Sequence, residues 1–289
     1  MGTFLWASPN SGTFETAADW SGDALPGSGD DALLTVAGAN YTVTTTAGET
    51  VNSLQTAANA TLAVGSGVNF SMTNGTGSGA NAGQISVSNN AYLYVGGTFD
   101  NTSTVTGGGV VLNGVANTTD LRLVGATTTF TGGGSVVLAT GGNNVIVGDA
   151  GASNTLVNVN NTFSGVGNIG AGNLTLVNQT AGVIDANQTG VLTLQVNGGV
   201  TNTGLLEATN TGGLVINGAS INNVGGTILA TGSGSHVDLQ SMGVTGGTLT
   251  AGAGAQIDLN TGDNSTFDGS SAVTITSGTN VNALPGSLT

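Results

Sequence analysis

The 289-residue sequence contains no Cys and no Lys, and a single Arg, Arg122, stands against 15 acidic residues. The absence of Cys excludes a disulfide framework, thiol catalysis and Cys-ligated zinc. With a formal charge of −14, the chain cannot neutralise a row of phosphates, so we expect neither nucleic acid nor an anionic membrane surface as a partner. No run of about 18 apolar residues occurs, so we expect no membrane insertion through a helix.

Charged and aromatic residues are also scarce, at 6% and 4% of the chain. An ordinary soluble domain carries about 25% charged residues, which makes this an unusual composition for an enzyme. The sequence has 52 Gly, and its 38% of hydrophobic residues recur in short alternating groups such as LTL, VDL and IDL. This alternation, together with the lack of any helical apolar stripe, predicts a folded and nearly all-β chain.

A repeat is visible in the second half. The pattern Gly-x-apolar-x-Ala begins at Gly182, Gly204, Gly226 and Gly247, at a nearly constant interval. A second short strand follows each copy, and a third precedes the next Gly. Three strands and three turns in such a repeat predict a parallel β-solenoid, a β-helix with about 20–22 residues per coil.

Stacked coils align equivalent residues, so the repeat also predicts internal ladders. We expect one apolar column inside the solenoid, formed by Ile184, Leu206, Ile228 and Leu249. Asn202 and Asn223 precede equivalent turns, and we expect their side-chain amides to stack at one corner.

The organisation along the chain is uneven. Residues 1–55 hold both Trp residues and two acidic clusters, which predicts a cap over the open end of the column. Residues 56–289 are predicted to form the solenoid, with irregular coils to about residue 170 and regular coils from about 172 to 262. Roughly ten or eleven coils at about 4.8 Å each give a rod on the order of 50 Å.

Two segments resemble a known family. The first runs from Trp6 to Asp31, with the spacing Trp-x13-Trp-Ser-Gly-x3-Pro-Gly-x-Gly-Asp-Asp; the second is the block TNTGLLEATNTGGLVINGASINNVGG from Thr201. They resemble the passenger regions and repeats of filamentous-haemagglutinin-like and autotransporter-type bacterial adhesins. The resemblance implies a right-handed β-helix that is extracellular or on a bacterial cell surface and serves in adhesion or as a fibre.

These observations together predict a non-enzymatic structural or adhesive protein of a surface, fibre or biofilm matrix. Open β-helix ends can add to one another, so we expect head-to-tail self-association into filaments. Glycans or a host or cell surface are the other expected partners. No cofactor is expected, and calcium is the one ion for which the sequence offers candidate ligands.

The first calcium candidate is Asp149. The segment GGNNVIVGDAG from Gly141 is similar to one copy of the glycine–aspartate nonapeptide that binds calcium in type I-secreted proteins. That resemblance implies Asp149 as a ligand, but Asn144 stands where a carboxylate is expected. The competing interpretation is another solenoid turn.

The second candidate is the pair Asp185 and Glu207, which occupy the same outward position in consecutive coils. A spacing of about 4.8 Å suits either a calcium bridge or the two carboxyl groups of a glycosidase. The competing interpretation is a solvated pair produced by repetition alone.

His236, Asp238 and Asp258, with Gln256 beside them, are predicted to share one outward face and form the only acid–base cluster. This cluster supports an alternative function, a glycan-binding or carbohydrate-active protein, against the simpler interpretation of an exposed His on a polar face. Arg122 is expected to pair with Asp120, and one Arg is too few for a polyuronate lyase.

A third possible function is ice binding, which uses flat Thr-x-Thr arrays. Thr residues occur at 44–46, at 102 and 104, and at 127–129. We expect them not to recur at one register over successive coils, which favours an ordinary polar β-face.

Overall fold

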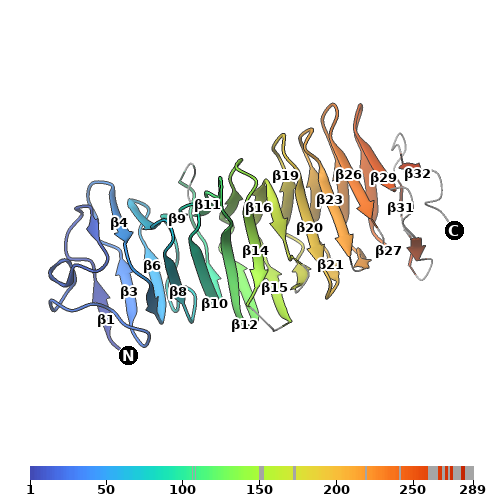
Figure 1. Cartoon of the computed structure of the whole chain (residues 1–289). Helices are drawn as coiled ribbons and strands as arrows, with labels where there is room; N and C mark the ends of the chain where they lie inside the picture. Colours follow the sequence, from blue (N-terminus) through green and yellow to red (C-terminus); the bar gives the residue numbers. More distant parts are fainter. Residues whose placement is uncertain are drawn as a thin grey trace.

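The computed structural model describes residues 1–105, 107, 109–149, 153–171, 174–218, 220–240, 242–259, 266–268, 271–272, 274–275 and 281–283. In these residues the chain is nearly all β, with one three-residue 3-10 helix, η1 (Ala17–Asp19). The strands stack in parallel into a β-solenoid of about ten turns (Figure 1). None of the helical structure in these residues is long and apolar enough to cross a membrane.

The solenoid has three faces, each a row of parallel strands. Face I consists of β1 (Thr3–Leu5), β3 (Asp31–Leu34), β6 (Ser53–Thr56), the second halves of β10 (Tyr92–Asp100) and β12 (Thr119–Thr131), β15 (Asn154–Asn158), β18 (Leu174–Asn178), β21 (Val200–Asn202), β24 (Ile221–Asn222), β27 (Gly243–Thr245) and β30 (Thr266–Asp268).

Face II consists of β5 (Glu49–Val51), β8 (Asn69–Met72), the first halves of β10 and β12, β14 (Asn144–Gly148), β17 (Gly167–Ile169), β20 (Leu192–Val196), β23 (Leu214–Gly218), β26 (His236–Gln240), β29 (Gln256–Leu259) and β32 (Val281–Ala283).

Face III is a sheet of 12 strands: β2 (Gly12–Thr13), β4 (Tyr41–Thr45), β7 (Ala60–Val64), β9 (Gln84–Val87), β11 (Gly109–Leu112), β13 (Ser135–Leu138), β16 (Thr162–Gly165), β19 (Val183–Ala186), β22 (Leu205–Ala208), β25 (Thr227–Ala230), β28 (Thr248–Ala251) and β31 (Thr274–Ile275).

The predicted apolar column is confirmed. Ile184, Leu206, Ile228 and Leu249 are register partners on successive strands of face III, and each is fully buried. Residues alternate between buried and half-buried along each of these strands, because successive side chains point to opposite faces of a sheet. The interior is thus built from one inward residue per register position.

The predicted Asn stack is also confirmed, and it is longer than the sequence indicated. The Asn202 side-chain amide donates to Asn223 Oδ1 at 2.7 Å. Upstream, Asn158 donates to Asn178 at 2.9 Å, and Asn178 donates to Asn202 at 2.8 Å. All four side chains are fully buried, so their mutual hydrogen bonds satisfy groups that water cannot reach.

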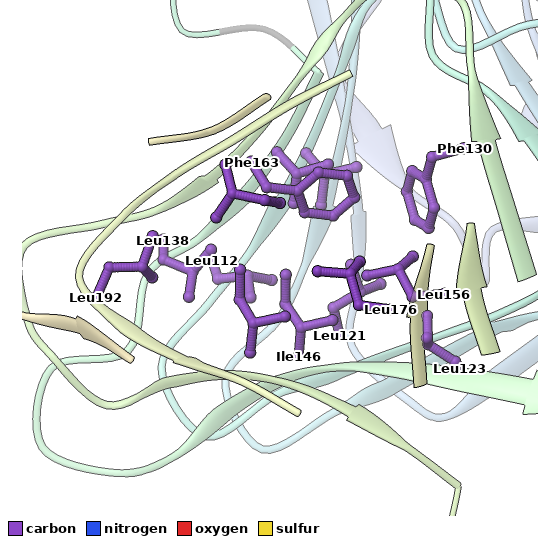
Figure 2. Packing of buried hydrophobic residues seen from close by; sticks show 14 of the residues in the cluster. Leu112, Leu121, Leu123, Phe130, Leu138, Ile146, Leu156, Phe163, Leu176 and Leu192 are labelled. Atoms are coloured by element: carbon purple, nitrogen blue, oxygen red, sulfur yellow. The ribbon is translucent and has the colours of Figure 1, made fainter. Parts of the chain in front are cut away.

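Aromatic side chains fill the core of the upstream coils. The ring of Phe130 lies 5.3 Å from that of Phe99 and 5.2 Å from that of Phe163, between ring centroids. Figure 2 shows Phe130 and Phe163 among buried Leu side chains. These distances suit the tilted or edge-on contacts that aromatic pairs prefer. The sequence pattern gives no sign of this stack.

The number of residues per coil differs between the two halves of the solenoid. Along face III the coils lengthen steadily from the one that joins Leu62 to its register partner Ile85 to the one that joins Val136 to Phe163. The next coil, from Phe163 to Ile184, is markedly shorter, and the coils keep nearly that length as far as Leu249. Irregular coils therefore precede regular ones, with the change at Phe163.

The N-terminal end is covered by its own chain. Trp6, Phe14 and Trp20 are buried, and Trp20 packs against both other rings at centroid distances of 5.2 and 4.9 Å. Phe14 also contacts Phe70 of the core at 5.4 Å. This aromatic cluster closes the end of the apolar column.

The same segment covers the outer edge of β1. Leu5 donates its backbone N–H to Ser21 Oγ and accepts the Ser21 N–H, while Ala7 donates to the Asp19 carbonyl. The cap is confined to the part of the chain before β3. β3 and β4, inside the predicted 1–55 segment, already pair in register with β6 and β7 as coil strands.

Candidate functional site

The predicted cluster of His236, Asp238 and Asp258 assembles on face II. His236 pairs in register with Gln256, and Asp238 pairs with Asp258, because β26 and β29 are neighbouring strands. His236 Nδ1 lies 3.1 Å from Asp238 Oδ1, and Gln256 donates to Asp258 Oδ2 at 2.7 Å. One ligand-capable atom from each of His236, Asp238 and Asp258 lies within 4.8 Å of the others.

A glycine on the preceding coil makes room for the imidazole. A Cβ added at Gly213 would lie only 2.3 Å from His236 Cε1, and Gly213 has a φ of +75°, which disfavours other residues. The His236 ring therefore rests over bare backbone. This role of Gly213 was not predicted, although the register between β23 and β26 places the two residues together.

The cluster is partly shielded from water. The Asp238 side chain is 18% exposed, and Asp258 is buried. Burial raises the pKa of Asp238, His236 lowers it, and Asp258 raises it again. Two carboxylates and an imidazole are also ligand types for a divalent metal ion, and among the described residues this is the only such group of three.

The second candidate, Asp185 and Glu207, forms the predicted in-register pair on face III. Burial raises the pKa of Glu207 to about 7, with a further contribution from the Asp185 charge. Burial also raises the pKa of Asp185, opposed by a hydrogen bond from the Thr209 hydroxyl at 2.8 Å. A calcium ion takes six to eight oxygen ligands, and this pair with one hydroxyl supplies few of them.

The third candidate, Asp149, lies directly after β14, an ordinary solenoid strand paired with β12 and β17. Asn144 in the same segment is fully buried. Its Oδ1 accepts the Gly114 N–H, and its Nδ2 donates to the Ala139 carbonyl, both at 2.7 Å. Both polar atoms of the Asn144 side chain are thus hydrogen-bonded to backbone groups. Residues 150–151 of the motif lie outside the described part of the chain.

Arg122 pairs with Asp120, as predicted, at 2.7 Å. The structure adds two tyrosines that the sequence analysis missed. The Arg122 guanidinium carbon lies 4.5 Å from the ring centroid of Tyr92 and 5.8 Å from that of Tyr94. The three residues meet because β10 and β12 are in register, with Tyr94 paired to Arg122.

The expectation for the Thr residues is wrong at one position. Thr127 shares its register with Thr155 and Thr175 over three successive coils of face I. The adjacent column is Thr129, Val157 and Val177, so a Thr-x-Thr plane does not form there. Thr128 is fully buried and hydrogen-bonded to the Val95 carbonyl, which removes it from any outward array.

Comparison of the chain with models of protein families, with curated proteins and with solved structures found no match.

Proposed function

We propose that this chain is a non-enzymatic structural or adhesive element exposed outside a bacterial cell, at its surface or in a fibre or biofilm matrix. The observation that carries the proposal is the continuity of the internal ladders. The apolar column and the Asn stack run through successive coils and fix the outward residues at a spacing of about 4.8 Å. Such a rod suits many weak contacts made together with a surface.

The outward composition supports the same role. Like charges at one register face their own copies on the next coil and repel, so a stacked solenoid favours uncharged Thr, Ser and Asn outside. The proposed extracellular location follows from the resemblance of the Trp6–Asp31 segment and the Thr201 block to adhesin passenger regions.

Head-to-tail self-association is retained with one restriction. The hydrogen bonds to Leu5 and Ala7 cover the edge of β1, and a covered edge does not template another strand. Filaments formed by strand addition at this end would require the segment around Ser21 to leave. Electron microscopy tests self-association: filaments are expected once this segment leaves, and separate rods about 50 Å long under every condition would contradict it.

An adhesion assay tests the proposal. Beads coated with the chain are expected to stay on bacterial cells or biofilm matrix under flow longer than beads coated with albumin. Equal retention of both kinds of bead on every surface would contradict the adhesive role. A matching assay would follow release of reducing sugar from a polysaccharide panel, with no turnover expected.

The proximity of His236, Asp238 and Asp258 favours one second candidate, a carbohydrate-active protein. Sugar release that the Asp238→Asn variant abolishes, with the unfolding temperature unchanged, would replace the proposed function with this one. Ice binding, the third candidate, predicts thermal hysteresis, which the interrupted Thr columns of face I do not support.

A further inference from the structure

A groove on face II lies away from the candidate sites discussed so far. It is an open depression of about 410 Å³, lined by Gly48, Glu49, Thr50, Asn69, Ser71 and Tyr94. Its volume falls within the range of small-molecule sites, about 300–1,000 Å³. The lining residues lie on or next to β5, β8 and β10, where face II begins. Figure 1 shows β8 and β10 in the N-terminal half of the rod.

Side-chain size along one register line creates the hollow. Thr50, Ser71 and Tyr94 are partners on the successive strands β5, β8 and β10. Thr50 and Ser71 have small side chains, whereas Tyr94 on the next strand has a large ring that borders the space beside them. Gly48 has no side chain, and Glu49 adds a carboxylate to the lining.

The Tyr94 ring has a cationic neighbour on the following coil. Arg122, its register partner there, lies 5.8 Å from the ring centroid and is paired with Asp120. Tyr94 thus lies on the strand between this guanidinium and Ser71 of the groove. A contact on one side restricts the ring and lowers the conformational entropy that stacking costs.

The remaining lining residues carry hydrogen-bonding groups of both kinds. The Glu49 carboxylate accepts, the Asn69 amide donates and accepts, and the hydroxyls of Thr50 and Ser71 do either. A sugar ring has a face of C–H bonds and a rim of hydroxyls. An aromatic wall beside mixed donors and acceptors complements both parts of such a ring.

Charge selects among sugars. The chain has a formal charge of −14, and its single Arg is already paired with Asp120. Uronic-acid or sulfated sugars are therefore repelled by the overall field and find no free cation in this groove. We propose that the groove binds a neutral saccharide, with Tyr94 stacked on one sugar ring and Glu49 and Asn69 bonded to its hydroxyls. A scaffold role does not require this site, so the two proposals fail separately.

The test measures binding of the full chain to soluble β-glucan, galactomannan and N-acetylglucosamine oligosaccharides, with polygalacturonate as the acidic comparison. Wild type is expected to bind at least one neutral probe and not polygalacturonate. Tyr94→Ala is expected to weaken that binding tenfold or more. Tyr92→Ala is the matched control, because Tyr92 lies on the same strand and face, contacts Arg122 and does not line the groove.

Two further variants test the groove while keeping an aromatic ring at position 94. Ser71→Tyr places a large side chain in the groove and is expected to abolish saccharide binding. Tyr94→Phe keeps the aromatic ring, and its affinity for the saccharide is expected to stay within threefold of wild type. Unfolding temperatures confirm that each variant is folded. No binding to any neutral probe, preference for polygalacturonate, or equal losses in Tyr92→Ala and Tyr94→Ala would overturn the proposal.

Discussion

The coils before and after Phe163 fill their interiors with different kinds of side chain. Before it, the long coils that follow Leu62 enclose aromatic rings at positions 70, 99 and 130. After it, the shorter coils enclose no aromatic side chain as far as Leu259. In both regions the inward apolar side chains fill the interior toward close-packed density, with aromatic rings among them upstream and aliphatic side chains alone downstream.

The extra residues of the long coils are placed at corners, where the stack tolerates them. β12 runs from face II to face I, and its pairing with β10 shifts register between Gly96 and Gly97. The residues of β12 at positions 125–127 have no partner on β10 and are exposed. The pairing with β10 resumes at Thr128, so insertions of this kind alter the outline without breaking the internal ladders.

The Asn stack spans both regions with the same chemistry but different spacing. Upstream, Asn81 donates to Asn101 at 2.9 Å, and Asn101 donates to Asn161 across a sequence separation of 60 residues. The coil between them presents Gly at this corner, and a Cβ at Gly134 would lie 2.7 Å from the Asn101 amide. Downstream, three coils supply one Asn each, at positions 178, 202 and 223, and the stack ends where Asn223 donates to the Gly246 carbonyl.

The largest effect is expected in the aromatic core. Phe130→Ala removes the ring between Phe99 and Phe163 and leaves a cavity in a long coil. We expect a loss of about 3–5 kcal/mol in the free energy of unfolding. Denaturant titration followed by circular dichroism measures it.

Leu206→Ala in the regular region is the control, with an expected loss of about 2–4 kcal/mol. A smaller loss at Phe130 than at Leu206 would contradict the view that large rings hold the long coils together.

A smaller effect is expected in the Asn stack. Asn202→Ala leaves Asn223 Oδ1 without its donor and removes the acceptor that Asn202 offers to the Gly204 N–H. Each unsatisfied buried group costs about 1–3 kcal/mol. Faster hydrogen exchange at the amides of this corner, beside a lower unfolding midpoint, would show where the loss occurs.

Asn217→Ala is the matched control, because Asn217 is half-exposed and bonds only outward, to Gln240 at 3.2 Å. Its expected cost is within about 0.5 kcal/mol. Equal costs at Asn202 and Asn217 would mean that the buried stack adds nothing to stability.

The smallest effect concerns pH. Burial beside Asp185 raises the pKa of Glu207 to about 7 from an ordinary 4.5. The folded protein therefore holds this proton more tightly than the unfolded chain, so the contribution of Glu207 to stability is greatest below pH 4.5 and is lost as the pH rises from 4.5 through 7. In Glu207→Gln, we expect this fall to shrink by about 1 kcal/mol, because solvent screens a half-buried group.

Glu15, in the cap, provides a control of opposite sign. Burial alone would raise its pKa, but hydrogen bonds from the backbone N–H groups of Thr46 and Ala47 hold it below the ordinary value. Its contribution is present above pH 4.5 and is lost in acid, so Glu15→Gln is expected to reduce acid sensitivity. Unfolding midpoints between pH 3 and 8 that leave both variants parallel to wild type would contradict both assignments.

The predictable part of the fold comes from repetition at short, constant spacing. The Gly182, Gly204 and Gly226 repeats place Leu206 over Ile184 without knowledge of anything else in the chain. The His236 cluster follows in the same way, because Asp238 and Asp258 hold equivalent positions in consecutive VDL and IDL strands. In these coils, local alternation and the repeat length determine the register.

The Phe stack and the Arg122–tyrosine contact were not predictable on those grounds. Phe99 meets Phe130, and Tyr94 meets Arg122, across coils whose lengths differ from those of their neighbours. Sequence spacing could not place these residues side by side without knowledge of which corner residues are left over. The groove beside Tyr94 was hidden for the same reason, whereas the repeat register alone places Gly213 beside His236.

The sequence by itself determined a charge-poor, all-β stack with an apolar column, an Asn ladder and an aromatic N-terminal segment. Those properties depend on composition and on period, which are local quantities. Only the tertiary structure decided which outward side chains share a surface, how the edge of β1 is covered and where a hollow opens on face II. These depend on the register between coils of unequal length, which is set by the packing of each coil on the one before it.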